Sequence, residues 1–287
     1  FDPYLDDLGG GEKYMMTLAQ CLSGNNDVTV FWNSQEDLRK VAERFSLDLS
    51  KVRLKNNIFS SNYLFFRRCL ESLNYDAIVV LSDGSIPFVL SKKLFIHFQQ
   101  PFPDIRMSLK NSLKKMRVKS FFCNSLFTKS FVDKEFGIES QVIYPPIDIE
   151  MKKNKKENII LHVGRFRARN IGLEDYKKQG VMINAFKKMV TVGLENWKFI
   201  FAVGLQSEDW PKFEKLQDQA KGYPIEFLIN LNKDKLYKVY SMSKIYWHAS
   251  GYGENLDKNP ELAEHFGIST VEAMAAGVVP VVINAGG

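Results

Sequence analysis

Glu264 and Glu272 lie eight positions apart in the run EHFGISTVEAMAAG, which covers residues 264–277. The letters VEAMAAG favour a helix, and the Phe-Gly pair and small polar residues before them are typical of a loop that enters one. Free N–H groups and the positive dipole end at a helix start suit a phosphate. Glu272 would lie in the first turns of the helix, where a carboxylate can accept hydrogen bonds from sugar hydroxyls. Glu264 would lie on the loop, across the same pocket.

Several polar side chains follow apolar runs that we expect to be strands. Gly164 and Arg165 come directly after the strand-like run ENIILHV, and Lys177 begins the next expected helix after a long loop. In the first half, His97 lies at the end of the run LFIHF. Ligands of α/β proteins bind beyond the carboxyl ends of the strands. These positions are therefore candidates for a binding site.

Three consecutive glycines, Gly9, Gly10 and Gly11, precede the helical stretch EKYMMTLAQCL. Glycines at a helix start allow the backbone to approach a phosphate closely. The spacing is not that of the dinucleotide fingerprint G-x-G-x-x-G, and no strand precedes the run. A phosphate-facing turn and an ordinary glycine-rich loop both remain open.

Apolar strands alternate with amphipathic helices along both halves of the chain. The strand-like runs are rich in β-branched and aromatic residues, which is typical of parallel strands buried on both faces. We expect strands near residues 27–32, 76–82, 94–98, 120–125, 141–146, 157–164, 197–204, 225–230, 244–250 and 278–284. Such alternation predicts an α/β fold with two doubly wound domains.

The boundary between the domains is expected near residue 150. A pair of prolines ends a strand there, and a Lys-rich, charged stretch with linker composition follows over residues 151–157. A chain of 287 residues is about twice the usual domain size. We therefore predict one domain over residues 1–150 and a second over residues 151–287.

Composition narrows the class of protein. Hydrophobic residues make up 45% and charged residues 25% of the chain, which is ordinary for globular proteins. No apolar stretch approaches the roughly 20 residues of a membrane span, and no signal peptide is recognisable at Phe1. Cys21, Cys69 and Cys123 lack metal-ligand spacing, so we expect reduced core thiols in a cytosolic protein. The net charge of +6 suits an anionic partner.

A stretch that contains cations and no acid covers residues 106–119. Met107, Leu109, Leu113 and Met116 interleave with the cations at helical spacing. The cations are Arg106, Lys110, Lys114, Lys115, Arg117 and Lys119. This pattern fits a helix on an anionic membrane surface, or a surface helix with an apolar core face and a solvated basic face. We expect no nucleic-acid partner, because the aromatic residues lie in strands rather than among these cations.

The whole run over residues 264–277 resembles the E-x7-E signature of retaining glycosyltransferase family 4, in the form found in its α-mannosyltransferases. VGRF…KKQGVMINAF is similar to the family's G-R…K…I-x-A-F motif, GGGE to its GG-x-E turn, and HFQQPFP to its H-F-P-like segment. The resemblance covers nearly the whole chain. It implies the GT-B architecture, in which two Rossmann-like domains face each other across a cleft: an acceptor-side domain first and a donor domain second.

The resemblance also implies roles for the charged candidates. Arg165 and Lys177 would neutralise the donor diphosphate as it leaves, with Lys178 as a fallback one position away. Glu264 would bind hydroxyls of the donor sugar, and Glu272 would hold the ribose.

The remaining candidates receive roles from the same resemblance. Phe266, Gly267 and Ile268 would offer backbone amides to the donor, and Gly164 would lie beside it. His97 would reach the donor sugar at the reaction centre. The glycines of the GG-x-E turn would lean over the donor pyrophosphate and the acceptor. We expect the other histidines, His162, His248 and His265, to serve the core or the shape of a loop.

The resulting prediction is a retaining hexosyltransferase that needs neither a metal nor another cofactor. It would move a hexose from a GDP- or UDP-linked donor to a lipid-linked or saccharide acceptor, in the cytoplasm or at the inner face of a membrane. No D-x-D metal motif is present. Two alternatives stay open: an epimerase or glycogen-synthase-like polymerase on the same fold, and a catalytically impaired protein that binds sugar nucleotides or lipids. The family has a strand before the glycine turn and further elements beyond AGG, so we expect a truncated chain.

Overall fold

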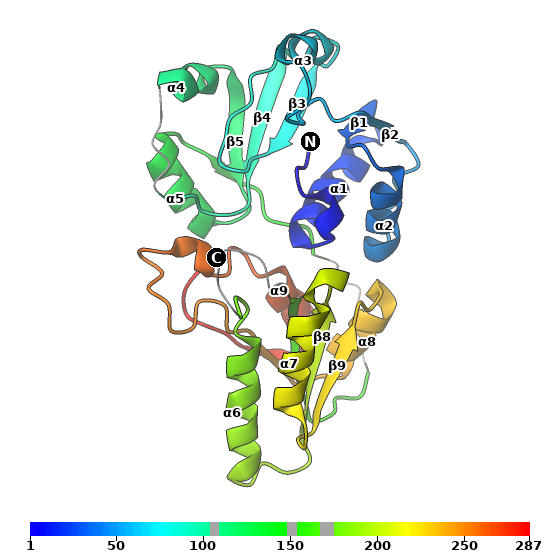
Figure 1. Cartoon of the computed structure of the whole chain (residues 1–287), viewed down its shortest axis with the longest axis vertical. Helices are drawn as coiled ribbons and strands as arrows, with labels where there is room; N and C mark the ends of the chain where they lie inside the picture. The colour runs from blue at the N-terminus through cyan, green and yellow to red at the C-terminus, as the bar shows by residue number, and fades with distance from the viewer. Residues whose placement is uncertain (104–108, 148–153, 167–174) are drawn as a thin grey trace. The chain divides into compact units, whose positions relative to one another are not determined.

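The computed structural model describes residues 1–103, 109–147, 154–166 and 175–287 (Figure 1). The chain divides into two compact units, residues 1–146 with Gly287, and residues 147–286. The boundary expected after residue 150 falls within residues 148–153, which lie outside the described part.

The first unit contains two parallel sheets. β1 (Val28–Phe31) pairs with β2 (Val52–Lys55), and a four-stranded sheet has the order β3-β4-β5-β6. Those four strands are β3 (Ala77–Leu81), β4 (Lys93–Phe98), β5 (Val118–Cys123) and β6 (Gln141–Val142). The helices are α1 (Gly10–Leu22), α2 (Gln35–Phe45), α3 (Phe65–Ser72), α4 (Leu109–Lys115) and α5 (Leu126–Phe136).

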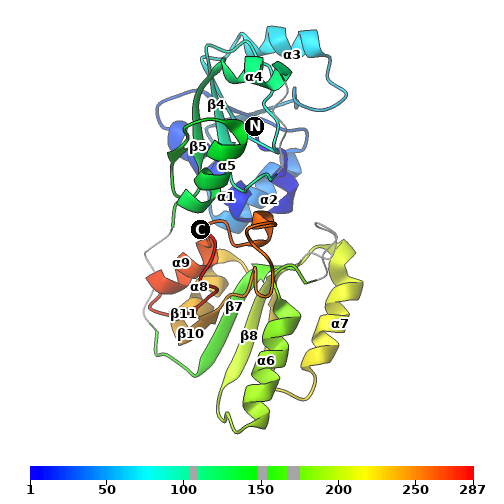
Figure 2. The ribbon, with the colours of Figure 1, turned by 90° about the vertical axis from the view of Figure 1, so that its left-hand side faces the viewer.

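The second unit is built on a five-stranded parallel sheet with the order β11-β10-β7-β8-β9 (Figure 2). Its strands are β7 (Ile159–Arg165), β8 (Lys198–Gly204), β9 (Ile225–Ile229), β10 (Ile245–Trp247) and β11 (Val279–Val281). Its helices are α6 (Gln179–Thr191), α7 (Trp210–Ala220), α8 (Lys233–Met242) and α9 (Ile268–Ala275).

Alternate residues of the central strands face opposite sides of this sheet, and each side has its own core. On one side Ile160, Phe199 and Phe201 pack with residues of α6 and α7. On the other side Leu161 and Ile200 pack with residues of α8 and α9. Both faces of a strand are therefore buried, which explains why β7 and β8 read as continuous apolar runs. The predicted doubly wound arrangement is confirmed for this unit.

Among the described residues a strand lies near every predicted strand position, and β2 is an additional one. The sequence VRLK of β2 alternates apolar and charged residues, and it pairs only with β1. An alternating segment of four residues carries little of the signal that identifies a buried strand. None of the described helices is both long and apolar enough to cross a bilayer.

The basic stretch differs in part from the expectation. Leu113 and Met116 are 68% and 81% exposed, so these two residues do not belong to an apolar core face. Two of the cations hold the fold: Lys115 donates to carbonyl oxygens at the end of α5, and Arg117 donates to the Val89 carbonyl. Arg106 lies outside the described residues.

The expectation for the thiols also needs one correction. Cys69 and Cys123 are buried and free, but Cys21 is exposed on α1 and is not a core thiol. Burial raises the pKa of Cys123 to about 11, which keeps this thiol protonated and unreactive.

Candidate active site

Glu264 is the centre of a polar cluster in the second unit. Its Oε2 accepts hydrogen bonds from Lys177 Nζ and from His248 Nε2, each at 2.8 Å. Its Oε1 accepts from the backbone N–H of Gly267 at 3.2 Å. The three partners come from the segment before α6, the end of β10 and the start of α9. The cluster therefore lies at the carboxyl edge of the sheet, where α/β proteins bind their ligands.

The electrostatics of this cluster favour an ionic pair. Burial opposes the charge of Glu264, but Lys177 and His248 outweigh it and hold the pKa of this carboxyl well below its usual value. Burial likewise opposes the charge of Lys177, and the Glu264 carboxylate overcomes it and raises the pKa of that ammonium. Glu264 is thus a carboxylate and Lys177 a cation at neutral pH.

His248 was expected to lie in the core, and it is buried, but it also belongs to the Glu264 cluster. The side chain is buried, yet its Nε2 contacts the Glu264 carboxylate, which can only accept, so Nε2 carries a proton. His162 lies next to it, with ring centroids 6.0 Å apart. The signal that could have identified His248 is its position directly after strand β10.

His162 keeps the structural role that the sequence suggested. Its Nδ1 donates to the Trp247 carbonyl at 2.9 Å, and its Nε2 accepts from the Gln179 amide at 3.3 Å. Burial lowers the pKa of His162 to about 3, so the ring is neutral. A Cβ at Gly164 would lie 2.9 Å from His162 Nε2, so the glycine is needed for this close approach.

Lys177 and Lys178, the two lysines considered for the donor site, have different partners in the structure. Lys177 pairs with Glu264, whereas Lys178 pairs with Glu254 at 2.5 Å. Arg165 ends β7 and lies close enough to lower the pKa of Lys177, though less than Glu264 raises it. Lys177 of the predicted donor site is therefore in contact with Glu264, and Arg165 lies near Lys177.

Glu272 has surroundings of its own. It lies within α9, is buried, and accepts a hydrogen bond from the hydroxyl of Tyr240 at 3.2 Å. Tyr246 lies near both glutamates: its hydroxyl contacts the Ser269 hydroxyl at 2.7 Å, and both carboxylates act on its pKa. Burial, above all, raises the pKa of Tyr246, which stays a neutral hydroxyl.

The backbone N–H of Gly267, which was predicted to contact the donor, has a partner within the protein. Gly267 precedes α9 with φ of +81°, a conformation that favours glycine. Its N–H donates to Glu264 Oε1, so it does not point freely at a ligand as expected. Ile268 begins α9, and Phe266 precedes Gly267 on the same loop.

In the first unit, His97 lies at the carboxyl end of β4 and is fully buried. Its ring stacks on Phe122 and packs against Tyr14. Nδ1 donates to the Phe122 carbonyl at 3.1 Å, so Nε2 is the acceptor of a neutral ring. Burial lowers the pKa of His97 to about 3, and among the described residues Nε2 has no hydrogen-bond partner.

Asn124, which directly follows the neighbouring strand β5, also has a buried acceptor atom without a hydrogen-bond partner among the described residues. Its amide nitrogen donates to the Gln99 carbonyl at 2.9 Å. Its Oδ1 is buried and, within the described ranges, accepts no hydrogen bond. The carboxyl edge of the four-stranded sheet thus has two buried acceptor atoms for which the described residues supply no donor.

The side chains of Glu12 and Gln99 form hydrogen bonds with the glycine turn. Gly9 N–H donates to Glu12 Oε2 at 2.5 Å, and Glu12 is buried. A Cβ at Gly11 would lie 2.3 Å from the Gln99 amide oxygen, while Gln99 donates back to the Gly11 carbonyl. Gly10 begins α1. The Gln99 side chain therefore lies beside Gly11, and an approach of phosphate to this turn stays a prediction.

The part of the chain that contains Glu264 is similar to a known protein family. Residues 146–287 match the family of glycosyl transferases group 1. The match covers nearly the whole of the second unit. The predicted relationship to glycosyltransferases, and to α-mannosyltransferases among them, is confirmed by this match and by the relatives below.

Two relatives from Dictyostelium discoideum carry mannosyltransferase names. The GDP-Man:Man(3)GlcNAc(2)-PP-Dol alpha-1,2-mannosyltransferase is 28% identical over 54% of this chain and 31% of its own length. The alpha-1,3/1,6-mannosyltransferase ALG2 is 25% identical over 98% of this chain and 80% of its own length. The chain spans about a third of the length of the curated relatives it matches first.

The fold is shared with a protein whose structure was solved in complex with UDP and glucose. That protein, HepE of Anabaena, is similar with a TM-score of 0.63 and 16% sequence identity. The similarity covers 97% of this chain and 78% of that chain. At this identity it concerns the fold alone, and it confirms the predicted α/β fold class of GT-B type.

Proposed function

We propose that the protein transfers a hexose from a nucleoside diphosphate sugar to a saccharide or lipid-linked acceptor. The observation that carries the proposal is the Glu264 carboxylate held between Lys177 and His248 at the carboxyl edge of a glycosyl transferases group 1 domain. The names of the relatives make GDP-mannose the first donor to test.

The free bonding capacity of this cluster fits the two ends of such a donor. An ammonium has three N–H donors, of which Glu264 uses one, so Lys177 retains capacity for phosphate oxygens. A carboxylate offers about four acceptor positions, and the contacts from Lys177, His248 and Gly267 occupy three of them. Glu264 can therefore accept one further bond, from a hydroxyl of the donor sugar.

Each charged group then has a role in the reaction. The bond from the sugar's anomeric carbon to the diphosphate oxygen breaks, and a bond to the acceptor hydroxyl oxygen forms on the same face. The hydroxyl proton passes to the departing diphosphate. Lys177 and Arg165 stabilise the charge that develops on the leaving group, and Glu264 faces the positive charge on the sugar. Groups fixed in place before the charge develops lower the barrier most.

Glu272 and His97 complete the proposal. Glu272 holds the ribose, since it is a buried carboxylate on α9 and already accepts a hydrogen bond from a hydroxyl, that of Tyr240. His97 accepts a hydrogen bond from a sugar hydroxyl, because its ring is neutral and its Nε2 is an acceptor. A role as a phosphate-binding cation is incompatible with its low pKa.

A membrane surface is the proposed location of a lipid-linked acceptor, with the protein peripheral on the cytoplasmic side. In the first unit Leu64, Phe65, Phe66 and Leu70 of the α3 region are exposed, Phe66 by 79%. Phe88 connects this patch to the basic stretch, because it contacts Phe65 and lies under Arg117. Arg67, Lys93 and Lys119 are also exposed in this part of the unit. Apolar side chains rimmed by cations suit an anionic bilayer.

The test of the main proposal begins with binding. GDP and UDP are titrated into the protein by calorimetry, with EDTA present because we propose that no metal is required. Transfer from GDP-mannose to a mannoside is then followed by mass spectrometry. Failure of both nucleotides to bind would overturn the proposal. Tight binding without any transfer would favour the alternative of a catalytically impaired binding protein.

A further inference from the structure

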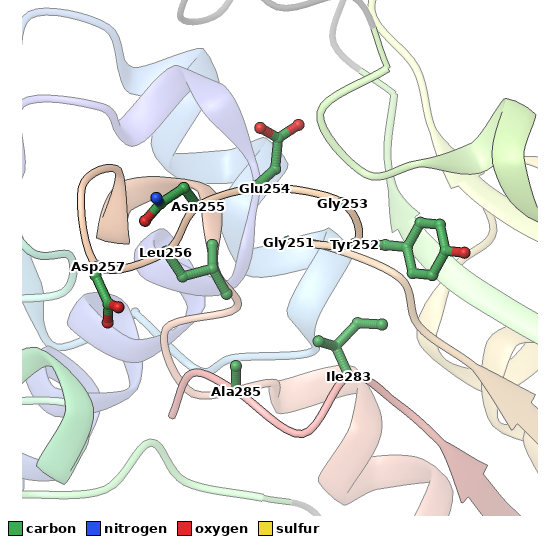
Figure 3. A pocket seen from close by; sticks show the side chains of 9 residues that line it. All are labelled: Gly251, Tyr252, Gly253, Glu254, Asn255, Leu256, Asp257, Ile283 and Ala285. Atoms are coloured by element: carbon green, nitrogen blue, oxygen red, sulfur yellow. The ribbon is translucent and has the colours of Figure 1, made fainter.

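A pocket of about 690 Å³ lies beside the Glu264 cluster in the second unit (Figure 3). The turn over residues 251–257, which follows β10, forms one wall, and Ile283 and Ala285 form the other. This volume lies within the range of roughly 300–1,000 Å³ that is usual for small-molecule sites. None of the residues discussed so far as donor-binding lines it.

The conformation of the turn over residues 251–257 is fixed by contacts within the protein. Gly251 and Gly253 have φ of +86° and +77°, values that a side chain would strain. The Leu256 side chain folds back so closely that a Cβ at Gly251 would lie 3.0 Å from it. Asn255 Oδ1 accepts from the Lys258 N–H at 3.2 Å and closes the end of the turn.

The walls of the pocket are tied to the cluster at three points. Glu254 pairs with Lys178, the neighbour of Lys177. Gly251 lies against Ala263, the residue before Glu264, since its Cβ would be 3.6 Å from the Ala263 Cα. A Cβ at Gly286, next to Ala285, would be 2.4 Å from the Glu264 carbonyl oxygen. A ligand in the pocket therefore lies next to the loop that carries Glu264.

The lining has an apolar centre and a polar rim. Figure 3 shows Leu256 and Ile283 projecting into the space between the two walls, whereas Glu254 points away from it. Asn255 and Asp257 lie at one end and Tyr252 at the other. A sugar ring has an apolar C–H face and hydroxyl edges, which match such a lining.

The charge of the lining argues against a second phosphate site. Asp257 and Glu254 are acids, and no lysine or arginine is among the described residues that line the pocket. Lys178 touches it only through its ion pair with Glu254. An anionic ligand would meet like charge, while a neutral ligand with many hydroxyls would find carboxylate and amide acceptors.

We propose that this pocket is a saccharide subsite that holds a neutral sugar ring of the acceptor next to Glu264. That the saccharide is the acceptor rests on the proposed function, whereas binding of the saccharide does not. Mannosides are the probes to use, given the names of the relatives.

The test measures mannoside binding and nucleotide binding separately. Saturation-transfer NMR detects methyl α-D-mannopyranoside and a linear mannotriose, and calorimetry detects GDP. Asp257→Asn, Asn255→Ala and Ala285→Phe are expected to weaken mannotriose binding about tenfold or more, through lost hydrogen bonds or a filled pocket. GDP affinity should stay within about twofold. Ala285 is exposed, so the larger side chain fills the pocket without entering a core.

Asp218→Asn, which changes an exposed acid on α7, is the matched control and should alter neither ligand. If mannotriose does not bind at millimolar concentration, or binds equally to all the pocket variants, the subsite is overturned. If GDP fails to bind while mannotriose binds and the variants weaken it, the proposed function fails and the subsite stands. If the variants that weaken mannotriose leave the Michaelis constant for the acceptor unchanged, the assignment to the acceptor is overturned.

Discussion

The two units place very different groups at the carboxyl edges of similar parallel sheets. In the second unit the edge carries Glu264, Lys177 and His248, which are charged or polar and bonded to one another. In the first unit it carries His97 and Asn124, which are neutral and each have an acceptor atom without a donor in the described structure. One edge is ionic and its groups are bonded to one another, whereas the other is neutral and has buried acceptors without a donor among the described residues.

The difference teaches how each edge can receive a ligand. A buried charge must be paired, so an anion enters the second unit by joining or replacing contacts that already exist. A buried acceptor without a donor costs about 1–3 kcal/mol, which a ligand hydroxyl can recover. This difference fits the proposal that the second unit binds the diphosphate and that the first unit binds hydroxyl groups.

The largest effect is expected from the ionic edge. Glu264→Gln should lower turnover by about 10²–10³-fold, the usual loss when one preorganised group that faces developing charge is removed. Steady-state kinetics with GDP-mannose would measure it. Glu272→Ala serves as the contrast, because ribose contacts are similar before and during the reaction and the change should mainly raise the Michaelis constant. Equal effects of both variants on turnover would show that the two roles are assigned wrongly.

The second prediction uses the two neighbouring lysines as a matched pair. Lys177→Met should weaken nucleoside diphosphate binding by about 1–3 kcal/mol, the usual contribution of a charge-assisted hydrogen bond. Lys178→Met should leave binding nearly unchanged, because Lys178 pairs with Glu254 instead of Glu264. Calorimetry with EDTA present would compare the two. A larger loss in the Lys178 variant, or a requirement for Mg²⁺ or Mn²⁺, would contradict the proposed donor site.

Local sequence predicted the strands and the edges of the sheets, but it did not predict the partners at those edges. The run ENIILHV identified β7 because a strand buried on both faces needs apolar residues throughout. His248 is sixteen positions from Glu264 and Lys177 is 87, and no short-range pattern reports such contacts. Periodicity placed Leu113 and Met116 on one helix face, but it could not say whether protein or solvent covers that face.

The third prediction addresses the neutral edge. His97→Phe removes the Nε2 acceptor and should lower turnover about tenfold, the value of one neutral hydrogen bond to a sugar hydroxyl. Nucleotide binding should not change, because the variant lies in the first unit and carries no charge. Kinetics and calorimetry on the same sample would separate the two effects. A large loss of nucleotide affinity would mean that the neutral edge also binds the diphosphate, and the comparison between the units would fail.

The fourth prediction concerns pH and stability. His97 and His162 have pKa values of about 3 in the fold against 6.5 as the ordinary value, so the unfolded chain binds protons that the folded chain rejects. Stability should therefore fall as the pH decreases below 6.5, by up to roughly 1.4 kcal/mol per pH unit for each histidine. Glu264 has a depressed pKa, so its contribution is lost only below its ordinary value of 4.5.

Urea unfolding between about pH 7 and about pH 5 would measure this slope. His97→Phe and His162→Phe should each reduce the slope by the contribution of the ring that is removed, and His265, with a pKa lowered to about 4, keeps a contribution in the second unit. A slope that neither variant reduces would show that the buried rings are not the source of the pH dependence.

The smallest effect is expected at the membrane, where the comparison between the units extends to their surfaces. In the first unit Phe66 and Met116 are exposed next to exposed cations, each of which contributes roughly 1 kcal/mol near an anionic surface. Phe66→Ser with Met116→Ser should reduce sedimentation with anionic liposomes and leave GDP binding intact. Val192→Ser removes an 85% exposed apolar residue from the second unit and should have no effect. High salt should also release the protein, because the Debye length falls from about 8 Å to about 3 Å at 1 M. If the wild-type protein ignores anionic liposomes at low salt, or if the Val192 variant behaves like the double variant, the exposed patch of the first unit is not a membrane surface.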